Sequence, residues 1–481
     1  MSLYSFLYLP RSVDLSRFKP QNIYFKESVY VDKTRTEIFP LTDDFREYMY
    51  IRSAFRVSDE EIRLSVIKDV NNTNSLAYVY GDKQGRVVLE CHLPTCPDFF
   101  SPPCTVNGYI GRILKLTSDD NDEVLVLKSK TGIVARINVE DVRKPAKHKN
   151  PTYPHTLGVC LQPMYYVTDY PMLIQFFEFW LNEGSTKFYF YWESMSPQVK
   201  DLIEFYQATS NAEIELIPWS RLPVSPTVTI KQNPNAYWFR LEVFLGIFDC
   251  MMRARYNVKY IAQTDLDETI FVNGSQTLIE YMESMNKKHP DLVDVQFLSR
   301  RAYINGSNEK ISHPFKFSFE PYEAFIADVA VFKKPLYTKM IHRPERDFKV
   351  HIHRSQLPEL IPGTNKRYKH VDAPPMEASV FHFRKQSGMY STGKTFNTTS
   401  FAAKAEQWLA NFENRQLTSQ LSETLDWVYS VPKFAHALEI CRQKQNKARA
   451  QRCHNLLECE VHLDIEKETS LIRANNSWIY V

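Results

Sequence analysis

The stretch Val258–Phe271, VKYIAQTDLDETIF, decides the fold of the larger part of the chain. Its first residues are β-branched and aromatic, which is typical of a buried strand. Asp265 and Asp267 follow at the end of that strand. Residues two apart in an extended segment share one face, so both carboxylates can hold one hard divalent cation, Mn²⁺ or Mg²⁺. Alternatively, Asp265 caps a helix that starts at Leu266, and the D-x-D spacing is accidental.

Strands and helices alternate before this stretch. We expect strands at 157–160, 187–192, 213–219 and 258–262, and helices at 170–182, 197–208 and 236–256. Further strands are expected at 292–298, 326–332 and 378–384, and a helix at 401–412. This order predicts an α/β fold with a mostly parallel sheet and helices on both faces. Ligands bind such sheets beyond the carboxyl ends of the strands, which is where Asp265 lies.

The chain divides into three regions by composition. Residues 1–150 contain short strand-like runs around turn signals such as Gly81-Asp82-Lys83, which predicts a small antiparallel β domain. The Pro- and Lys-rich stretch 144–154 marks its boundary with the main α/β domain at 151–430. Residues 431–481 are predicted to form a polar helical tail.

Composition excludes several classes of protein. Hydrophobic residues make up 43% and charged residues 24% of the 481, as in an ordinary globular protein. A net charge of +3 argues against a nucleic-acid partner. The apolar start, MSLYSFLYLP, is shorter than the about 20 residues that span a bilayer, so we expect no membrane anchor in this chain.

The cysteines and glycosylation signals permit a secretory location. Eight cysteines without a C-x-x-C pair argue against a zinc ribbon, and they leave both disulfides and free thiols open. N-x-S/T sequons occur at five positions, Asn71, Asn273, Asn305, Asn397 and Asn475.

Two chemistries use a D-x-D pair after a strand. In a phosphatase of the haloacid-dehalogenase type, D-x-D-x-T would make Asp265 the nucleophile and Asp267 the acid. In nucleotide-sugar glycosyl transfer, the pair would hold a cation that stabilises the departing diphosphate. The polar Gln263 and Thr264 stand where the phosphatase pattern has apolar residues, which favours glycosyl transfer. A second D-x-D, at Asp120 and Asp122, lies in a predicted hairpin turn and shows how easily chance supplies the spacing.

The stretch Gly158–Arg384 resembles glycosyltransferase family 92. The similar pieces are VCLQPMY at 159–165, FFEFW at 176–180, FYFY at 188–191, Asp249-Cys250 with Arg253 and Arg255, KYIA at 259–262 with DLDE at 265–268, Val350-His351, and HFR at 382–384. The resemblance implies a GT-A catalytic domain of a Golgi membrane protein. It also implies β1,4 transfer of galactose, with inversion, from UDP-galactose to a glycan or glycoprotein acceptor. Phe383 stands where the family usually has Tyr.

The resemblance also implies roles for individual residues. Asp265 and Asp267 would hold Mn²⁺, or Mg²⁺, on the UDP diphosphate, and Glu268 would orient them. His382 would be a further metal ligand, with His351 or His353 as alternatives. Two remaining roles are left open: Arg384 would pair with the diphosphate or form a surface ion pair, and Cys160 and Cys250 would form a disulfide or remain two buried thiols.

An inverting transfer also needs a general base for the acceptor hydroxyl. The sequence offers four carboxylates and does not choose among them: Glu320, Asp328, Glu345 and Asp372. A third hypothesis keeps the fold without turnover, as a non-catalytic glycan-binding relative.

Overall fold

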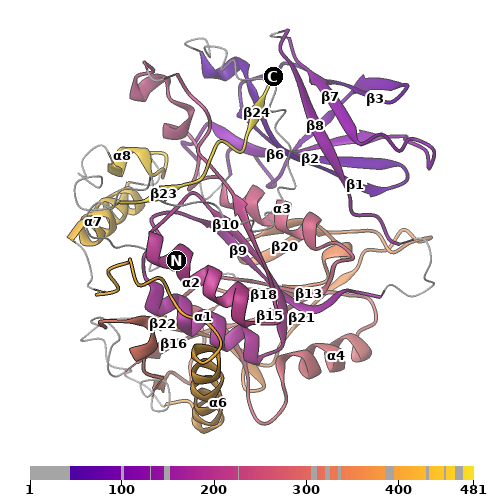
Figure 1. Ribbon diagram of the computed structural model, residues 1–481. Coiled ribbons are helices and arrows are strands. Elements are labelled where there is room, and N and C mark those ends of the chain that lie inside the picture. Colours follow the sequence, from indigo (N-terminus) through magenta and orange to yellow (C-terminus); the bar gives the residue numbers. More distant parts are fainter. Residues whose placement is uncertain are drawn as a thin grey trace.

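The structure of the protein is a computed structural model. It describes residues 44–98, 102–130, 132–145, 152–225, 227–304, 311–319, 325–333, 337–384, 395–429, 433–448, 451–460 and 470–481. Figure 1 shows a strand-rich region at the top, where β1 to β8 lie, and a region of mixed helices and strands below it. Within these ranges, no helix combines the length and the apolar character needed to cross a membrane.

The N-terminal region forms a nine-stranded sheet in the order β4-β3-β7-β8-β1-β2-β6-β5, with β24 added on β1. The bounds are β1 Met49–Ser58, β2 Glu61–Asp69, β3 Ala77–Tyr80, β4 Lys83–Arg86, β5 Val88–Cys91, β6 Val106–Leu114, β7 Val124–Lys128 and β8 Val134–Asp141. Its neighbours are antiparallel except β1 and β8. The predicted hairpin forms between β3 and β4, where Gly81 has the positive φ of 59° that suits glycine in a tight turn.

A seven-stranded sheet carries the stretch that opened the sequence. Its order is β12-β10-β9-β13-β18-β15-β21. The bounds are β9 His155–Met164, β10 Ser185–Trp192, β12 Glu213–Pro218, β13 Val258–Thr264, β15 Leu292–Phe297, β18 Lys339–His342 and β21 Lys369–Asp372. The sheet is mixed rather than wholly parallel, because β18 runs antiparallel to both β13 and β15. After β15 the chain returns to the sheet at the edge where β13 and β15 end. The strand β18 therefore runs in the opposite direction to these two strands.

Helices cover both faces of this sheet. In β10, Phe188 and Phe190 pack against Phe177 of α1 (Tyr170–Asn182). The alternate residues point the other way, and Tyr191 donates a hydrogen bond to Asp249 of α3 (Val243–Ala254) at 2.6 Å. The remaining α-helices of the described ranges are α2 Pro197–Thr209, α4 Leu278–Lys288, α6 Thr399–Gln416, α7 Lys433–Lys447 and α8 Leu457–Glu460. Ser196 caps α2, since its side chain accepts a hydrogen bond from the backbone N–H of Val199.

A four-stranded sheet lies directly after the D-x-D pair, in the order β14-β22-β16-β17. Its strands are β14 Glu268–Val272, β16 Ser299–Tyr303, β17 Ile326–Ala327 and β22 Ala378–Arg384. The strand expected at 326–332 is therefore shorter than predicted. A separate ribbon pairs β19 (Asp347–His351) with β20 (Arg354–Pro358).

The helix expected at 236–256 begins only at Val243, so its predicted start was wrong. Arg240, Leu241 and Glu242 have φ values of 45°, 58° and 53°, a run of left-handed residues that no right-handed helix can include. A short 3₁₀ turn, Pro234–Ala236, precedes them.

The C-terminal segment differs from the polar helical tail that was expected at 431–481. Besides α7 and α8 it contains β23 (Ile472–Arg473), which pairs with β11 (Ser194–Met195), and β24 (Ile479–Tyr480), which pairs with β1. Trp478 and Val481 are buried. All eight cysteines are paired, as Cys91–Cys96, Cys104–Cys453, Cys160–Cys250 and Cys441–Cys459. The segment is therefore tied both to the N-terminal sheet and to the α/β region.

Candidate functional site

The D-x-D pair lies in a tight turn between β13 and β14. The backbone N–H of Glu268 donates to the carbonyl of Asp265 at 3.3 Å, and the Thr264 hydroxyl donates to the carbonyl of Glu268 at 3.2 Å. Because β14 begins at Glu268, no helix starts at Leu266. The helix-capping alternative is therefore wrong, and both aspartates stand at the carboxyl end of β13.

A lysine that belongs to none of the sequence motifs lies against this turn. The ammonium of Lys339, at the start of β18, is 3.0 Å from Asp265 Oδ2 and 2.9 Å from Glu268 Oε2. Burial alone lowers the pKa of Lys339, but the charges of Asp265 and Glu268 outweigh burial and raise that pKa above its ordinary value. Lys339 is therefore a fixed positive charge beside the first aspartate.

The second aspartate lies against His382. The Nε2 atom of His382 is 3.2 Å from Asp267 Oδ2, and Nδ1 is 3.9 Å from Glu268 Oε1. Glu268 and His382 face each other in the register of β14 and β22, which explains why the late histidine meets the early motif. The buried Nδ1 of His382 has no hydrogen-bond partner among the described residues.

The charges that the described residues bring into contact at this site do not balance. Asp265, Asp267 and Glu268 bring three carboxylates together, and Lys339 supplies one ammonium. Burial raises the pKa of Glu268, and the neighbouring aspartates raise it further against the opposing effect of Lys339. Uncompensated buried charge is unfavourable, so the site favours an additional cation.

Two of these residues are spaced as neighbouring ligands of a divalent metal ion are. Two ligands that lie next to each other around an octahedral ion, each about 2.1 Å from it, stand about 3 Å apart, close to the 3.2 Å between His382 Nε2 and Asp267 Oδ2. Carboxylate and imidazole ligands together suit Mn²⁺. Asp265 is held by Lys339 instead, so a cation that joins both aspartates must share Asp265 with that ammonium.

A second group of metal-ligand side chains lies deeper, and the sequence did not reveal it. Ligand atoms of Asp294, His342 and Asp347 lie within 4.8 Å of one another, and all three residues are buried. His342 is three residues along β18 from Lys339, which is about 10 Å at the rise of a strand. These residues come from three separate elements, so no short motif could have indicated them.

Hydrogen bonds already satisfy much of that second group. His342 Nδ1 is 2.9 Å from Asp347 Oδ2, and the Ser355 hydroxyl donates to Asp347 Oδ1 at 2.8 Å. His370 Nδ1 is 2.8 Å from Asp294 Oδ2. Each carboxylate of this group therefore has an imidazole partner, whereas Asp265 and Glu268 at the D-x-D turn pair with Lys339.

The candidate bases fall in different places. Asp328 follows β17 in the four-stranded sheet, and its Oδ1 is buried without a hydrogen-bond partner among the described residues. Glu345 is paired with Arg343 at 2.8 Å, beyond the end of β18 that is farther from Lys339. Asp372 is on β21, the edge strand of the seven-stranded sheet. Glu320 lies outside the described residues.

The other residues predicted to bind the metal or the diphosphate are His351, His353 and Arg384. The two histidines lie next to the site, and Arg384 ends the strand that carries His382. His353 Nδ1 is 3.0 Å from the carbonyl of Thr338, and the His353 N–H donates to His351 Nδ1 at 3.2 Å. Burial lowers the pKa of His351 to about 3, which keeps that ring neutral. Arg384 ends β22, where its backbone pairs with Tyr303, and its side chain lies outside the description.

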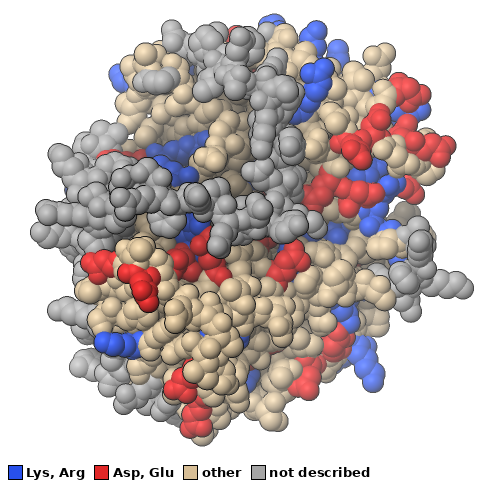
Figure 2. Space-filling model, in the orientation of Figure 1, with Lys and Arg blue, Asp and Glu red and all other residues tan. Residues whose placement is uncertain are grey.

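The second D-x-D pair is part of an ordinary turn. Asp120 accepts hydrogen bonds from the backbone N–H and the hydroxyl of Thr117, at 2.7 and 3.0 Å. Figure 2 shows acidic side chains gathered at the upper right, over the N-terminal sheet, with basic side chains among them. Exposed acidic residues at the ends of the strands in this region include Asp59, Asp119 and Asp141. Arg143 forms ion pairs with Asp59 and Asp141. The spacing at 120–122 is therefore explained without a ligand.

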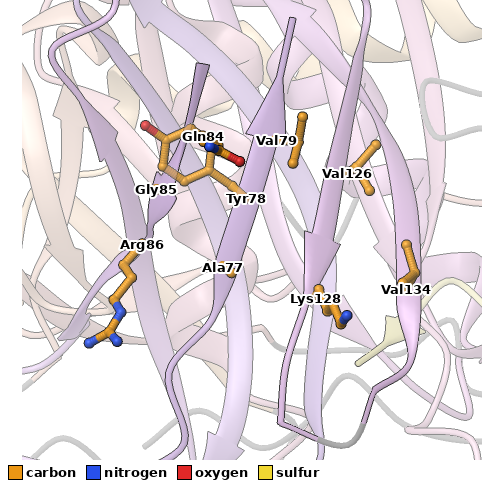
Figure 3. A pocket seen from close by; sticks show the side chains of 9 residues that line it. All are labelled: Ala77, Tyr78, Val79, Gln84, Gly85, Arg86, Val126, Lys128 and Val134. Atoms are coloured by element: carbon orange, nitrogen blue, oxygen red, sulfur yellow. The ribbon is translucent and has the colours of Figure 1, made fainter. Parts of the chain in front are cut away.

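One groove of about 420 Å³ lies on the outer part of the N-terminal sheet, far in the fold from the D-x-D pair. Figure 3 shows that its walls come from neighbouring strands of that sheet. Its lining is Ala77, Tyr78, Val79, Gln84, Gly85, Arg86, Val126, Lys128 and Val134. Because it contains no carboxylate and no imidazole, this groove does not supply the chemistry of the D-x-D site.

Comparison with known proteins identifies the family. Residues 155–425, more than half of the 481, match the model of glycosyltransferase family 92, which confirms the resemblance seen in the sequence. The chain is also similar to a solved structure described as the crystal structure of HddC from Yersinia pseudotuberculosis, at 11% identity over 47% of this chain and 92% of that one, with a TM-score of 0.21. A likeness this low supports no argument about fold or function. No curated protein matches the chain.

Proposed function

Because the chain belongs to glycosyltransferase family 92, we propose that it transfers galactose from UDP-galactose to a glycan acceptor, with Mn²⁺ held at Asp265 and Asp267. The observation that carries this proposal is the arrangement at the end of β13. There, Asp267 and His382 lie 3.2 Å apart, beside a buried excess of negative charge. A nucleotide sugar with a divalent cation is the kind of ligand that this arrangement suits.

The chain's own residues divide the work of binding. Asp267 and His382 would hold the cation, and Asp265 would complete the set while keeping its contact with Lys339. A bound Mn²⁺ would supply Lewis-acid stabilisation of the departing diphosphate. Lys339 pairs with Asp265 and Glu268 and offsets part of the negative charge of the turn before the cation and the donor arrive.

We propose Asp328 as the base among the three candidates that the structure describes. Glu268, His382 and Arg301 are register partners across β14, β22 and β16. The backbone N–H of Asp328 donates to the carbonyl of Arg301 at 3.1 Å, which continues this row into β17. Register partners share one face of a sheet, so Asp328 faces the same side as His382, about 10 Å away at the usual strand spacing. On that face of the sheet, Asp328 would accept the proton of the acceptor hydroxyl.

The finer features of the proposal follow from the family. We propose a GT-A arrangement of the nucleotide-binding half, inversion at the anomeric carbon and a β1,4 linkage. A secretory or Golgi location is supported by four disulfides, since such bonds persist in oxidising compartments. The family match favours transfer over the haloacid-dehalogenase phosphatase.

UDP release tests the proposed function. The full chain is incubated with several UDP-sugars and β-linked glycan acceptors, with Mn²⁺ or with EDTA. We expect release that depends on Mn²⁺ and is fastest with UDP-galactose. Asp328→Asn should lose turnover but still bind UDP, whereas Asp372→Asn, at the sheet edge, is the matched control and should keep turnover. Release in EDTA at the rate seen with Mn²⁺ would contradict metal dependence, and binding of glycans without release from any donor would favour a non-catalytic relative.

A further inference from the structure

A run of left-handed backbone immediately precedes α3. Arg240, Leu241 and Glu242 have positive φ angles, of 45°, 58° and 53°. Residues with a Cβ visit this region as single residues and rarely in succession. Strain of this kind persists only where surrounding contacts impose it, and it concentrates at functional sites. The strained turn Arg240–Glu242 therefore requires contacts that hold it, and its strain indicates a function.

Three parts of the chain hold this turn. The backbone N–H of Arg240 donates to the carbonyl of His454 at 3.2 Å, and the indole N–H of Trp219 donates to the carbonyl of Leu241 at 2.7 Å. The backbone N–H of Gly108, in β6, donates to Glu242 Oε1 at 2.9 Å. The N-terminal sheet and the C-terminal segment thus meet at a turn of the α/β region.

Two further features fix this meeting point. A Cβ on Gly108 would lie 2.6 Å from Glu242 Oε1, so any larger residue there displaces the glutamate. The disulfide Cys104–Cys453 joins the residue two before Val106 of β6 to the residue next to His454. The clamp formed by Gly108, His454 and this disulfide connects segments that are far apart in the sequence.

The turn presents the side chain of Arg240. Its guanidinium lies over the Phe239 ring, with 5.2 Å from Cζ to the ring centroid. Its Nε and Nη2 atoms are buried and have no hydrogen-bond partner among the described residues. Burial lowers the pKa of Arg240, against the opposing effects of Tyr165 and then Asp265. A cation with unused buried donors, within the electrostatic reach of the D-x-D pair, favours an anionic ligand.

We propose that Arg240 binds the diphosphate of the donor, and that the clamp on the Arg240–Glu242 turn exists to hold it there. This inference rests on the proposed function, since the diphosphate is the part of a nucleotide sugar that lies beside the cation of a D-x-D pair. A guanidinium offers two parallel N–H donors to a phosphate group. The diphosphate is then held by the cation at Asp265 and Asp267 and by Arg240. This gives the N-terminal sheet a role in donor binding through the hydrogen bond from Gly108 to Glu242.

Calorimetric titration of the full chain with UDP, in MnCl₂, tests the proposal. We expect Arg240→Gln to weaken UDP binding by about 10-fold or more, as loss of a charge-assisted contact does, and Arg240→Lys to recover part of that loss. Arg56→Gln is the matched control, because Arg56 also has buried, unpartnered nitrogens but lies in the N-terminal sheet, away from Asp265. Its UDP affinity should equal that of the wild type.

The outcomes separate the two proposals. If the wild type does not bind UDP, or if Asp267→Asn binds it equally well, the proposed function fails. If the wild type binds UDP and Asp267→Asn does not, but Arg240→Gln binds with unchanged affinity, the role of Arg240 is overturned.

Gly108→Ala tests the clamp without altering any group that touches the donor. We expect weaker UDP binding in this variant while its circular dichroism stays that of the wild type. Gly85→Ala, in the outer hairpin of the same sheet, is the control for a general effect on that sheet. Equal UDP affinity in the two glycine variants would overturn the clamp.

Discussion

Two groups of buried carboxylates and imidazoles lie about 10 Å apart along β18, and they differ in how their charges are met. In the deeper group, Asp294 and Asp347 each accept a hydrogen bond from a histidine, and Asp347 also accepts one from Ser355. In the group at the end of β13, Lys339 contacts Asp265 and Glu268, and His382 contacts Asp267 through Nε2. The Nδ1 atom of His382 has no partner among the described residues. Nε2 of His342, in the deeper group, also has no partner among the described residues, so the two groups differ in charge rather than in unpartnered nitrogens. We call the deeper group closed because each of its carboxylates has an imidazole partner, and the group at the end of β13 open because its described carboxylates outnumber the ammonium groups that contact them.

The difference separates a stabilising group from a binding group. A closed network of buried hydrogen bonds fixes the strands that contribute to it, here β15, β18, β19, β20 and β21. An open group retains unused ligand atoms and unbalanced charge, which a bound cation can satisfy. We therefore expect substitutions in the deeper group to lower stability and substitutions at the D-x-D site to lower activity.

The largest contrast is expected between Asp267→Ala and Asp347→Ala. Asp267→Ala removes a proposed ligand of the cation, so it should lower kcat/KM by about 100-fold or more. Because the lost carboxylate is one of three that are crowded together, the protein should remain as stable as the wild type. Asp347→Ala leaves His342 and Ser355 without their acceptor, which should lower the free energy of unfolding by about 3 kcal/mol and leave the activity of the folded fraction intact. Denaturant unfolding and UDP release measure the two effects. A loss of stability in Asp267→Ala equal to that in Asp347→Ala would remove the distinction.

Metal binding should separate the same two variants. At a Mn²⁺ concentration about 100 times its dissociation constant, binding to the folded state alone stabilises a protein by about 2.7 kcal/mol. We expect a rise in Tm with Mn²⁺ for the wild type and for Asp347→Ala, and none for Asp267→Ala. A Mn²⁺ response that disappears in Asp347→Ala and survives in Asp267→Ala would place the ion in the deeper group instead.

Lys339 is the residue that keeps the open group stable before a cation binds. Lys339→Met removes the ammonium and leaves Asp265, Asp267 and Glu268 together without compensation. In EDTA we expect this variant to lose about 3 kcal/mol of stability, the cost of breaking a buried ion pair, and to recover much of it in Mn²⁺. Thermal unfolding with and without Mn²⁺ measures this recovery. The control is Lys187→Met on β10, which removes another buried ammonium that pairs with two glutamates, Glu213 and Glu215. Equal losses in both solutions would show that Lys339 acts on the fold alone.

Local patterns predicted the parts of the fold that local forces determine. The predicted helix at 170–182 coincides with α1, because a capping Asp169 and a terminal Gly184 flank a continuous apolar run. The start of α3 was missed because Arg240-Leu241-Glu242 has high helix propensity, and contacts from Gly108 and His454 override it. Contacts of that range leave no signal in a short stretch of sequence.

The candidate site also combines residues that local patterns indicate with residues that only long-range contacts bring in. Asp265 and Asp267 could be proposed because their spacing is local, and the family resemblance supplied His382. Lys339 lies 74 residues from Asp265, in a stretch that matches no motif, and only the pairing of β13 with β18 brings the two together. The C-terminal segment appeared polar, yet its disulfides and the buried Trp478 make it part of the fold.

The smallest expected effect concerns the pH dependence of the deeper group. The hydrogen bond to Asp294 raises the pKa of His370 above its ordinary value of 6.5, so the folded protein holds this proton more tightly than the unfolded chain. The resulting stability is fully present below the unfolded pKa, and it is lost as the pH rises through the higher folded pKa. His370→Gln should therefore lower Tm at about pH 5.5 and leave it unchanged at about pH 8.5. The His370 side chain is 47% exposed, so solvent screens the pair, and the difference should shrink further in salt. A difference in Tm that grows toward high pH would mean that Asp294 does not hold this proton.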